Sequence, residues 1–169
     1  MNQNHPICSP VISRILAVLM AFGAVAIDWK IKTLLTSKIF VPSGPIDISP
    51  WFSLWLGIYP EALKSNHQFW ASLALNIGMA LLAVMLATWL FTTQDRRKIG
   101  AIGLVLGGVL GNLLERLCDG TITNVFYLHH GGYFDFLFNA GDAFIVVGVL
   151  ILILGNLVPH PKCCVEMAA

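Results

Sequence analysis

The sequence predicts an all-α membrane protein of four transmembrane helices, with a small extracytoplasmic β-sheet region after the first helix. Of its 169 residues, 57% are hydrophobic and 11% are charged, whereas soluble domains carry about 25% charged residues. Four apolar runs are each long enough for a bilayer span, which takes about 20 helical residues. Between the first and second runs, a segment rich in proline, glycine and aromatic residues is incompatible with a helix.

The whole chain is predicted to form one integral-membrane domain. Its spans are predicted at about residues 11–35, 69–91, 99–117 and 139–158. The first run is too long for the h-region of a signal peptide and continues into charged residues, so we expect a retained helix. The turn "TTQDRRK" between the second and third runs holds three of the ten basic residues. Concentrated Arg and Lys mark the cytoplasmic side, so both termini are expected in the cytoplasm.

The two segments on the other side of the membrane differ in character. Residues 36–68 contain "FVPSGPIDISPWFSLWLGIYP", in which apolar residues alternate with Pro, Gly and Ser. This pattern predicts short strands, and its aromatic residues favour the headgroup region. We therefore expect a small sheet at the outer membrane surface. Residues 119–138 are expected to form an amphipathic periplasmic stretch.

Polar residues inside the spans are costly in a bilayer and each needs a partner or a function. Asp28 and Lys32 are four residues apart on the first helix, which predicts a structural ion pair. Asn112 and Arg116 have the same spacing on the third helix, so their donors need acceptors from other helices. Small residues on that helix permit close helix contact: Gly103, Gly107, Gly108 and Gly111.

Asn139 and Asp142 lie three residues apart at the start of the fourth span and face the same way. An acid at this place either stabilises the helix dipole or carries chemistry. His129 and His130 lack further ligands at metal-site spacing, so neither a metal nor another cofactor is predicted. The net charge of +1, without a basic stripe, argues against nucleic acid as a partner.

Three motifs resemble those of the signal peptidase II family, the lipoprotein signal peptidases: "DWKIK", "GNLLERLCDGTITN" and "FNAGDAFIVVG". Members of that family are aspartic endopeptidases with two catalytic Asp residues at the outer surface of the cytoplasmic membrane. They cut a prolipoprotein just before its lipid-modified cysteine. The resemblance therefore implies diacylglyceryl-modified prolipoproteins and membrane lipid as partners. It also implies a monomer with its site near the extracytoplasmic face.

The resemblance assigns roles to individual residues. Asp142 matches one catalytic Asp, and the matches to substrate-binding residues are Asn112, Arg116 and Asn139. The second catalytic Asp falls on Asn124, whose amide neither takes nor gives a proton near neutral pH. The family's Asn-x-Gly-x-x-Phe motif is also absent from the sheet region, where "LGIYPEALKSN" stands.

Two other acids are candidates for the missing carboxylate, Asp135 and Glu61. On a continuous helix Asp135 would lie roughly 10.5 Å along the axis from Asp142, which is too far to share a proton. A segment that folds back would bring them closer.

Three interpretations of the chain stay open. One is a signal peptidase II-type endopeptidase with an altered pair of acids. Another is a catalytically impaired paralogue that binds lipoprotein or lipid without cleaving. The third, a small transporter, is least favoured because the sequence shows neither an internal repeat nor broken spans.

Overall fold

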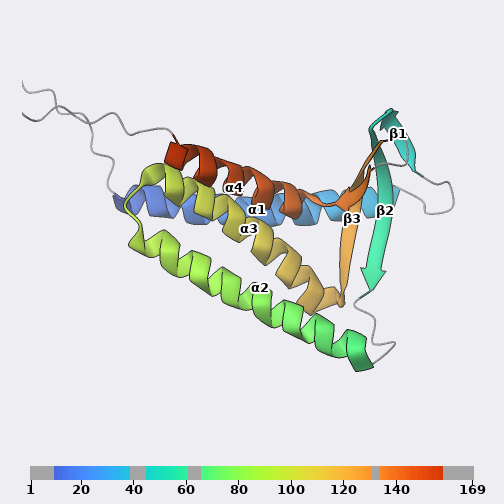
Figure 1. The fold of residues 1–169 in the computed structure, drawn as a ribbon, viewed down its shortest axis with the longest axis horizontal. Coiled ribbons are helices and arrows are strands. Elements are labelled where there is room, and N and C mark those ends of the chain that lie inside the picture. The colour runs from blue at the N-terminus through green and yellow to red at the C-terminus, as the bar shows by residue number, and fades with distance from the viewer. Residues whose placement is uncertain (1–9, 39–44, 61–65, 131–133, 158–169) are drawn as a thin grey trace, which may run out of the picture.

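The computed structural model describes residues 10–38, 45–60, 66–130 and 134–157. Its helices are α1 (Pro10–Lys38), α2 (Asn66–Thr92), α3 (Arg96–Asp119) and α4 (Ala140–Leu157). Its strands are β1 (Ile46–Ser49), β2 (Phe52–Pro60), β3 (Thr121–His130) and β4 (Phe134–Phe138). The helices run roughly along the long axis and the strands gather at one end (Figure 1). All four helices are long and apolar enough to cross a membrane, which confirms the predicted fold class.

Helix α3 is the centre of the helical bundle. It contacts α1, α2 and α4, and 67% of its most apolar stretch is buried, against 17–22% in the other three helices. Those three helices expose large apolar side chains on their outer faces, such as Phe22, Leu81 and Leu154. Apolar surfaces of this extent pack against lipid chains in a bilayer and would cause the protein to aggregate in water.

Glycines let α3 approach its neighbours closely, as the sequence predicts. A Cβ atom at position 107 would lie 2.7 Å from the carbonyl oxygen of Ala21 in α1, and one at position 108 would overlap the backbone of Gly141 in α4. At the N-terminus of α3, Asp95 caps the helix by accepting a hydrogen bond from the Arg97 backbone N–H at 3.0 Å. The backbones of α1, α3 and α4 therefore lie close together along the middle of the bundle.

The sheet is antiparallel throughout and has the order β1-β2-β3-β4. Residues 121–138, which the sequence analysis placed in an amphipathic stretch, supply half of its strands. Leu56 and Val125 are buried beneath the sheet and pack with Ile31 and Leu35 of α1. Val125 of β3 is fully buried, and the pairing of β3 with β2 joins segments that are far apart in the sequence.

Short connections place the start of β3 and the end of β4 beside the helices. Gly120 adopts a left-handed conformation with φ 62°, which favours glycine. Its N–H donates to the Arg116 carbonyl oxygen at 3.1 Å, closing α3, and β3 begins at the next residue. After β4, Asn139 alone separates the strand from α4. The junction of α1, α3, α4 and β3 therefore lies where the sheet meets the bundle.

Candidate active site

A buried ammonium group lies at the centre of this junction. Lys32 Nζ is 2.7 Å from Asp28 Oδ2, which confirms the predicted i,i+4 pair. The same nitrogen is 2.7 Å from Glu115 Oε2 and 3.2 Å from Asn112 Oδ1. These three acceptors match the three N–H donors of a lysine. All four residues are at most 6% exposed, so one ammonium group and two carboxylates lie together almost entirely out of water.

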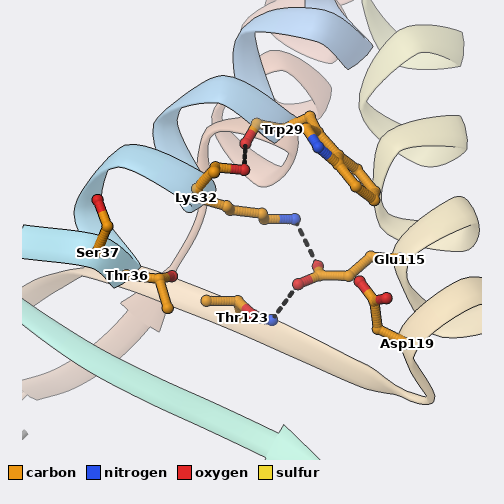
Figure 2. A pocket seen from close by; sticks show the side chains of 8 residues that line it. Trp29, Lys32, Thr36, Ser37, Glu115, Asp119 and Thr123 are labelled. Atoms are coloured by element: carbon orange, nitrogen blue, oxygen red, sulfur yellow. Dashed lines mark hydrogen bonds and ion pairs between the residues drawn. The ribbon is translucent and has the colours of Figure 1, made fainter.

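The two carboxylates of this cluster also bind backbone groups of other elements. Glu115 Oε1 accepts the N–H of Thr123 at 3.0 Å, which fastens β3 to α3 (Figure 2). Asp28 Oδ1 accepts the N–H of Gly141 at 2.8 Å, which fastens the start of α4 to α1. Together they fix the strand that carries Asn124 and the helix that carries Asp142.

Asp142 is held by the N-terminus of its own helix. Asn139 Oδ1 accepts the Asp142 backbone N–H at 2.9 Å, and Asp142 Oδ2 accepts the Asn139 backbone N–H at 3.1 Å. This reciprocal pattern is a capping box, in which the N-cap and N3 residues satisfy each other's backbone donors. Asp142 therefore has a capping role, and its other oxygen remains for further contacts.

Asn112 connects the buried charges to that second oxygen. Its Nδ2 donates to Asp142 Oδ1 at 2.8 Å while its Oδ1 accepts from Lys32. The ammonium group fixes the orientation of the amide, because a flipped side chain would bring its NH₂ group against the ammonium donors. The Asp142 carboxylate thus accepts hydrogen bonds at both oxygens.

Asn124 lies next to this group on β3. Its Oδ1 accepts a hydrogen bond from Asn139 Nδ2 at 3.0 Å, so Asn139 contacts both Asn124 and Asp142. A pocket of about 700 Å³ opens in front of them. Its walls are formed by Trp55, Arg116, Ile122, Asn124, Tyr127, Asp135, Leu137 and Asp142.

Asp135 enters this pocket from β4. It is exposed, and its Oδ1 accepts the Tyr127 hydroxyl proton at 2.6 Å. This hydrogen bond is the main reason why the pKa of Tyr127 is raised above its ordinary value of 10.0, with desolvation and the charge of Asp135 adding to it. The phenol is therefore a neutral donor throughout the physiological range.

The other side of the Lys32 cluster faces a second pocket, of about 370 Å³. Figure 2 shows Trp29, Lys32, Glu115 and Asp119 around it. The hydroxyl group of Thr33, another lining residue, donates to the Trp29 carbonyl oxygen at 2.8 Å. The three Lys32 donors are all used within the protein, so the ammonium group offers this pocket no unused donor.

The two histidines have partners within the sheet. His129 Nε2 is 2.8 Å from the Ser53 hydroxyl, which donates to Asp47 at 2.6 Å. His130 stacks on Trp51 with ring centroids 4.4 Å apart. Within the described ranges, no three His, Cys, Asp or Glu side chains gather in a way that would hold a metal ion.

The structure brings most of the candidate site residues together. Asn112, Asn139, Asn124 and Asp142 are linked by hydrogen bonds, and Arg116 and Asp135 line the same pocket. Glu61 lies outside the described residues. The sequence analysis assigned no function to Glu115 or Tyr127. The position of Glu115, three residues after Asn112, was the signal that could have placed it on the same face of the helix.

Such a pocket suits hydrolysis assisted by a carboxylate. Asp142 is fixed and faces a water-accessible space, Arg116 adds a positive charge, and the Asn124 amide adds a donor. A fixed carboxylate can take a proton from water, while nearby donors stabilise the negative charge that develops on a carbonyl oxygen.

Comparisons with known proteins identify the family of this chain. The family model described as signal peptidase (SPase) II matches residues 20–158. A lipoprotein signal peptidase of Beijerinckia indica is 29% identical over 145 residues, which cover 83% of this chain and 87% of the relative. A second, from Rhizorhabdus wittichii, is 35% identical over 127 residues, which cover 70% and 72%.

The fold has known counterparts as well. A solved bacterial membrane enzyme has a TM-score of 0.70 at 17% identity, with 91% of this chain and 94% of that one covered. Since the family match includes all of α2, α3 and α4, most of α1 and the whole sheet, this chain is a multi-pass bacterial membrane protein that belongs to the signal peptidase II family.

Proposed function

We propose that this protein cleaves the signal peptide of diacylglyceryl-modified prolipoproteins, just before the lipid-modified cysteine, with Asp142 as a catalytic carboxylate. The observation that carries the proposal is the Asp142 carboxylate at the wall of the 700 Å³ pocket, held by Asn112 and by the backbone of Asn139. The relatives reported above are lipoprotein signal peptidases. An extended peptide segment fits a pocket of this size.

The polar residues around Asp142 suit the binding of a peptide backbone. Arg116 and Asn124 present N–H donors to the pocket, which a substrate carbonyl oxygen can accept. Asn139 is fully buried and holds both Asn124 and Asp142, so it fixes the distance between them. The substrate-binding role that the family resemblance implies thus fits Arg116 directly, and Asn112 and Asn139 through the positions of Asp142 and Asn124 that they fix.

We place the pocket on the extracytoplasmic side of the bacterial cytoplasmic membrane. The end of the bundle opposite the sheet holds Arg96, Arg97 and Lys98 at the start of α3. Arg14 of α1 lies at the same end, where it donates to the Thr93 carbonyl oxygen at 3.3 Å. Basic residues concentrate on the cytoplasmic side, so the sheet and the pocket face outward.

The deciding experiment is cleavage of a synthetic diacylglyceryl-modified prolipoprotein peptide by the purified full-length protein in detergent. We expect cleavage before the modified cysteine, and a loss of about 10²–10⁴-fold in Asp142→Asn, since general acid–base groups contribute this much. Asp119→Asn is the matched control, because Asp119 is an exposed acid that lines the other pocket.

Two results would overturn the proposal. One is wild-type cleavage that is insensitive to Asp142→Asn. The other is the absence of cleavage by a wild-type protein that binds the peptide.

A further inference from the structure

Asp135 shares the wall of the pocket with Asp142 and Asn124. We propose that Asp135 of β4 supplies the second carboxylate of this site, and that Tyr127 positions it. The inference rests on the proposed function, because it concerns the same cleavage reaction. Asp135, on the strand next to β3, would then take the place of the acid that is missing at Asn124.

The side chain of Asp135 is held in place by its surroundings. The Tyr127 hydroxyl group donates to Asp135 Oδ1 at 2.6 Å. The Tyr127 ring is itself fixed, edge-on to Trp55 with centroids 5.0 Å apart and stacked on His129 at 4.8 Å. Strand pairing sets Asp135 opposite His129, so the acid stands on a paired strand. Such support is what a catalytic group needs for a defined geometry.

Asn124 and Asp135 then have different functions. Because Asn124 Oδ1 accepts from Asn139, its Nδ2 group is the part available to a ligand, and it can only donate. Asp135 has one oxygen bound to Tyr127, and its other oxygen remains for a proton. The residues that line the pocket thus include two carboxylates, those of Asp135 and Asp142, and one guanidinium group, that of Arg116.

The hydrolysis can be written with this pair. A water oxygen attacks the scissile carbonyl carbon and forms the new C–O bond, the Asp142 carboxylate takes one water proton, and the carbonyl π electrons move to its oxygen. When the tetrahedral intermediate collapses, the C–N bond breaks and its electron pair stays on nitrogen. In the reacting form of the protein Asp135 holds a proton, which it gives to that nitrogen; the proton on Asp142 then passes to Asp135 through water, which restores both acids.

The test uses the purified full-length protein and the lipid-modified peptide. Asp135→Asn keeps an acceptor for Tyr127 and adds no volume, so the fold should be unchanged. We expect its kcat to fall about 10²–10⁴-fold, as for the loss of a general acid. Adding Asn124→Asp to this variant should restore cleavage, because position 124 of β3 then supplies the second carboxylate. Asp119→Asn again serves as the control.

Tyr127→Phe tests the positioning role. It removes the hydroxyl group and keeps the ring between Trp55 and His129. We expect kcat to fall about 10-fold with KM unchanged, because Asp135 then loses the hydrogen bond that orients it. A merely structural tyrosine would lower the melting temperature and leave kcat unchanged.

An Asp135→Asn variant with wild-type kcat alongside an inactive Asp142→Asn variant would overturn the inference and leave the proposed function in place. A wild type that binds the peptide and does not cleave it would overturn both, whether or not Asn124→Asp makes it active.

Discussion

Replacing Lys32 by Met should destabilise the protein strongly, because it removes the cation from a buried cluster of charges. Asp28 and Glu115 would keep their carboxylates, whose side chains are 3% and 6% exposed, without an ammonium partner. Leaving one partner of a buried ion pair uncompensated costs about 3–5 kcal/mol. For a chain of this length each kcal/mol shifts Tm by about 2–4 °C, so we expect a decrease of about 6–20 °C.

The assay is thermal unfolding of purified variants in one detergent. Lys98→Met is the matched control, since Lys98 is one-third exposed and 4.0 Å from Asp95. Exposed pairs of this kind contribute about 0.2–1 kcal/mol. In the double variant Lys32→Met, Glu115→Gln, the new amide still accepts the Thr123 N–H and no charge remains on it. We therefore expect the double variant to lose less stability than the sum of the single changes.

A Lys32→Met shift no larger than that of Lys98→Met would refute this reasoning. It would mean that water or a neighbouring group compensates the two carboxylates in the folded protein. Additive effects in the double variant would likewise contradict the direct contact between Lys32 and Glu115.

Three further predictions concern helix packing, titration and topology. Gly107→Ala should destabilise by about 1–3 kcal/mol through overlap with the Ala21 carbonyl oxygen, while Gly100→Ala, with open space around it, should not. The pKa of Tyr127 is raised in the folded protein, so the neutral phenol contributes stability that should persist below pH 10 and disappear as pH rises through the folded-state pKa. Asp135→Asn should lower that pKa. The measurement is a titration of phenolate absorbance, with Tyr127→Phe used to subtract the other tyrosines. In a cysteine-free background, an impermeant thiol reagent applied to intact cells should label Phe136→Cys and spare Gln94→Cys, and the reverse would refute the proposed orientation.

The helices and the Asp28–Lys32 pair were accessible to sequence reasoning because their signals are local. A long apolar run defines a span by itself, and a spacing of four residues places two side chains on one face of a helix. Strand β3 was missed because its partner β2 is distant in the sequence: Asn124 pairs with Gly57 across the sheet. Strand β4 pairs with the nearby β3, with His130 opposite Phe134. The glycine pair in the sequence between the two segments is a local hairpin signal that the sequence interpretation did not use.

The same limit applies to the site. Asp142 and Asn139 were identified through a motif whose capping geometry is contained in four residues. The bond from Lys32 to Glu115 joins residues 83 positions apart on two helices, and no single segment encodes it. The place of Asp135 was undecided from the sequence because it depends on whether residues 134–138 form a strand or extend α4. The structure shows a strand, and the acid therefore lines the pocket.

Asn112 links the stabilising cluster to the reacting carboxylate, and its replacement by Asp tests that link. The new carboxylate would keep the acceptor for Lys32. It would replace the donor to Asp142 by a second acid, and two facing carboxylates bind a shared proton instead of both ionising. We expect kcat/KM for peptide cleavage to fall about 10²-fold or more near neutral pH. Asn112→Ser, which keeps a donor, should lose less. Equal kcat/KM for Asn112→Asp and the wild type between pH 5 and 9 would show that the bond from Asn112 does not orient Asp142, and the buried charges would then have only a structural role.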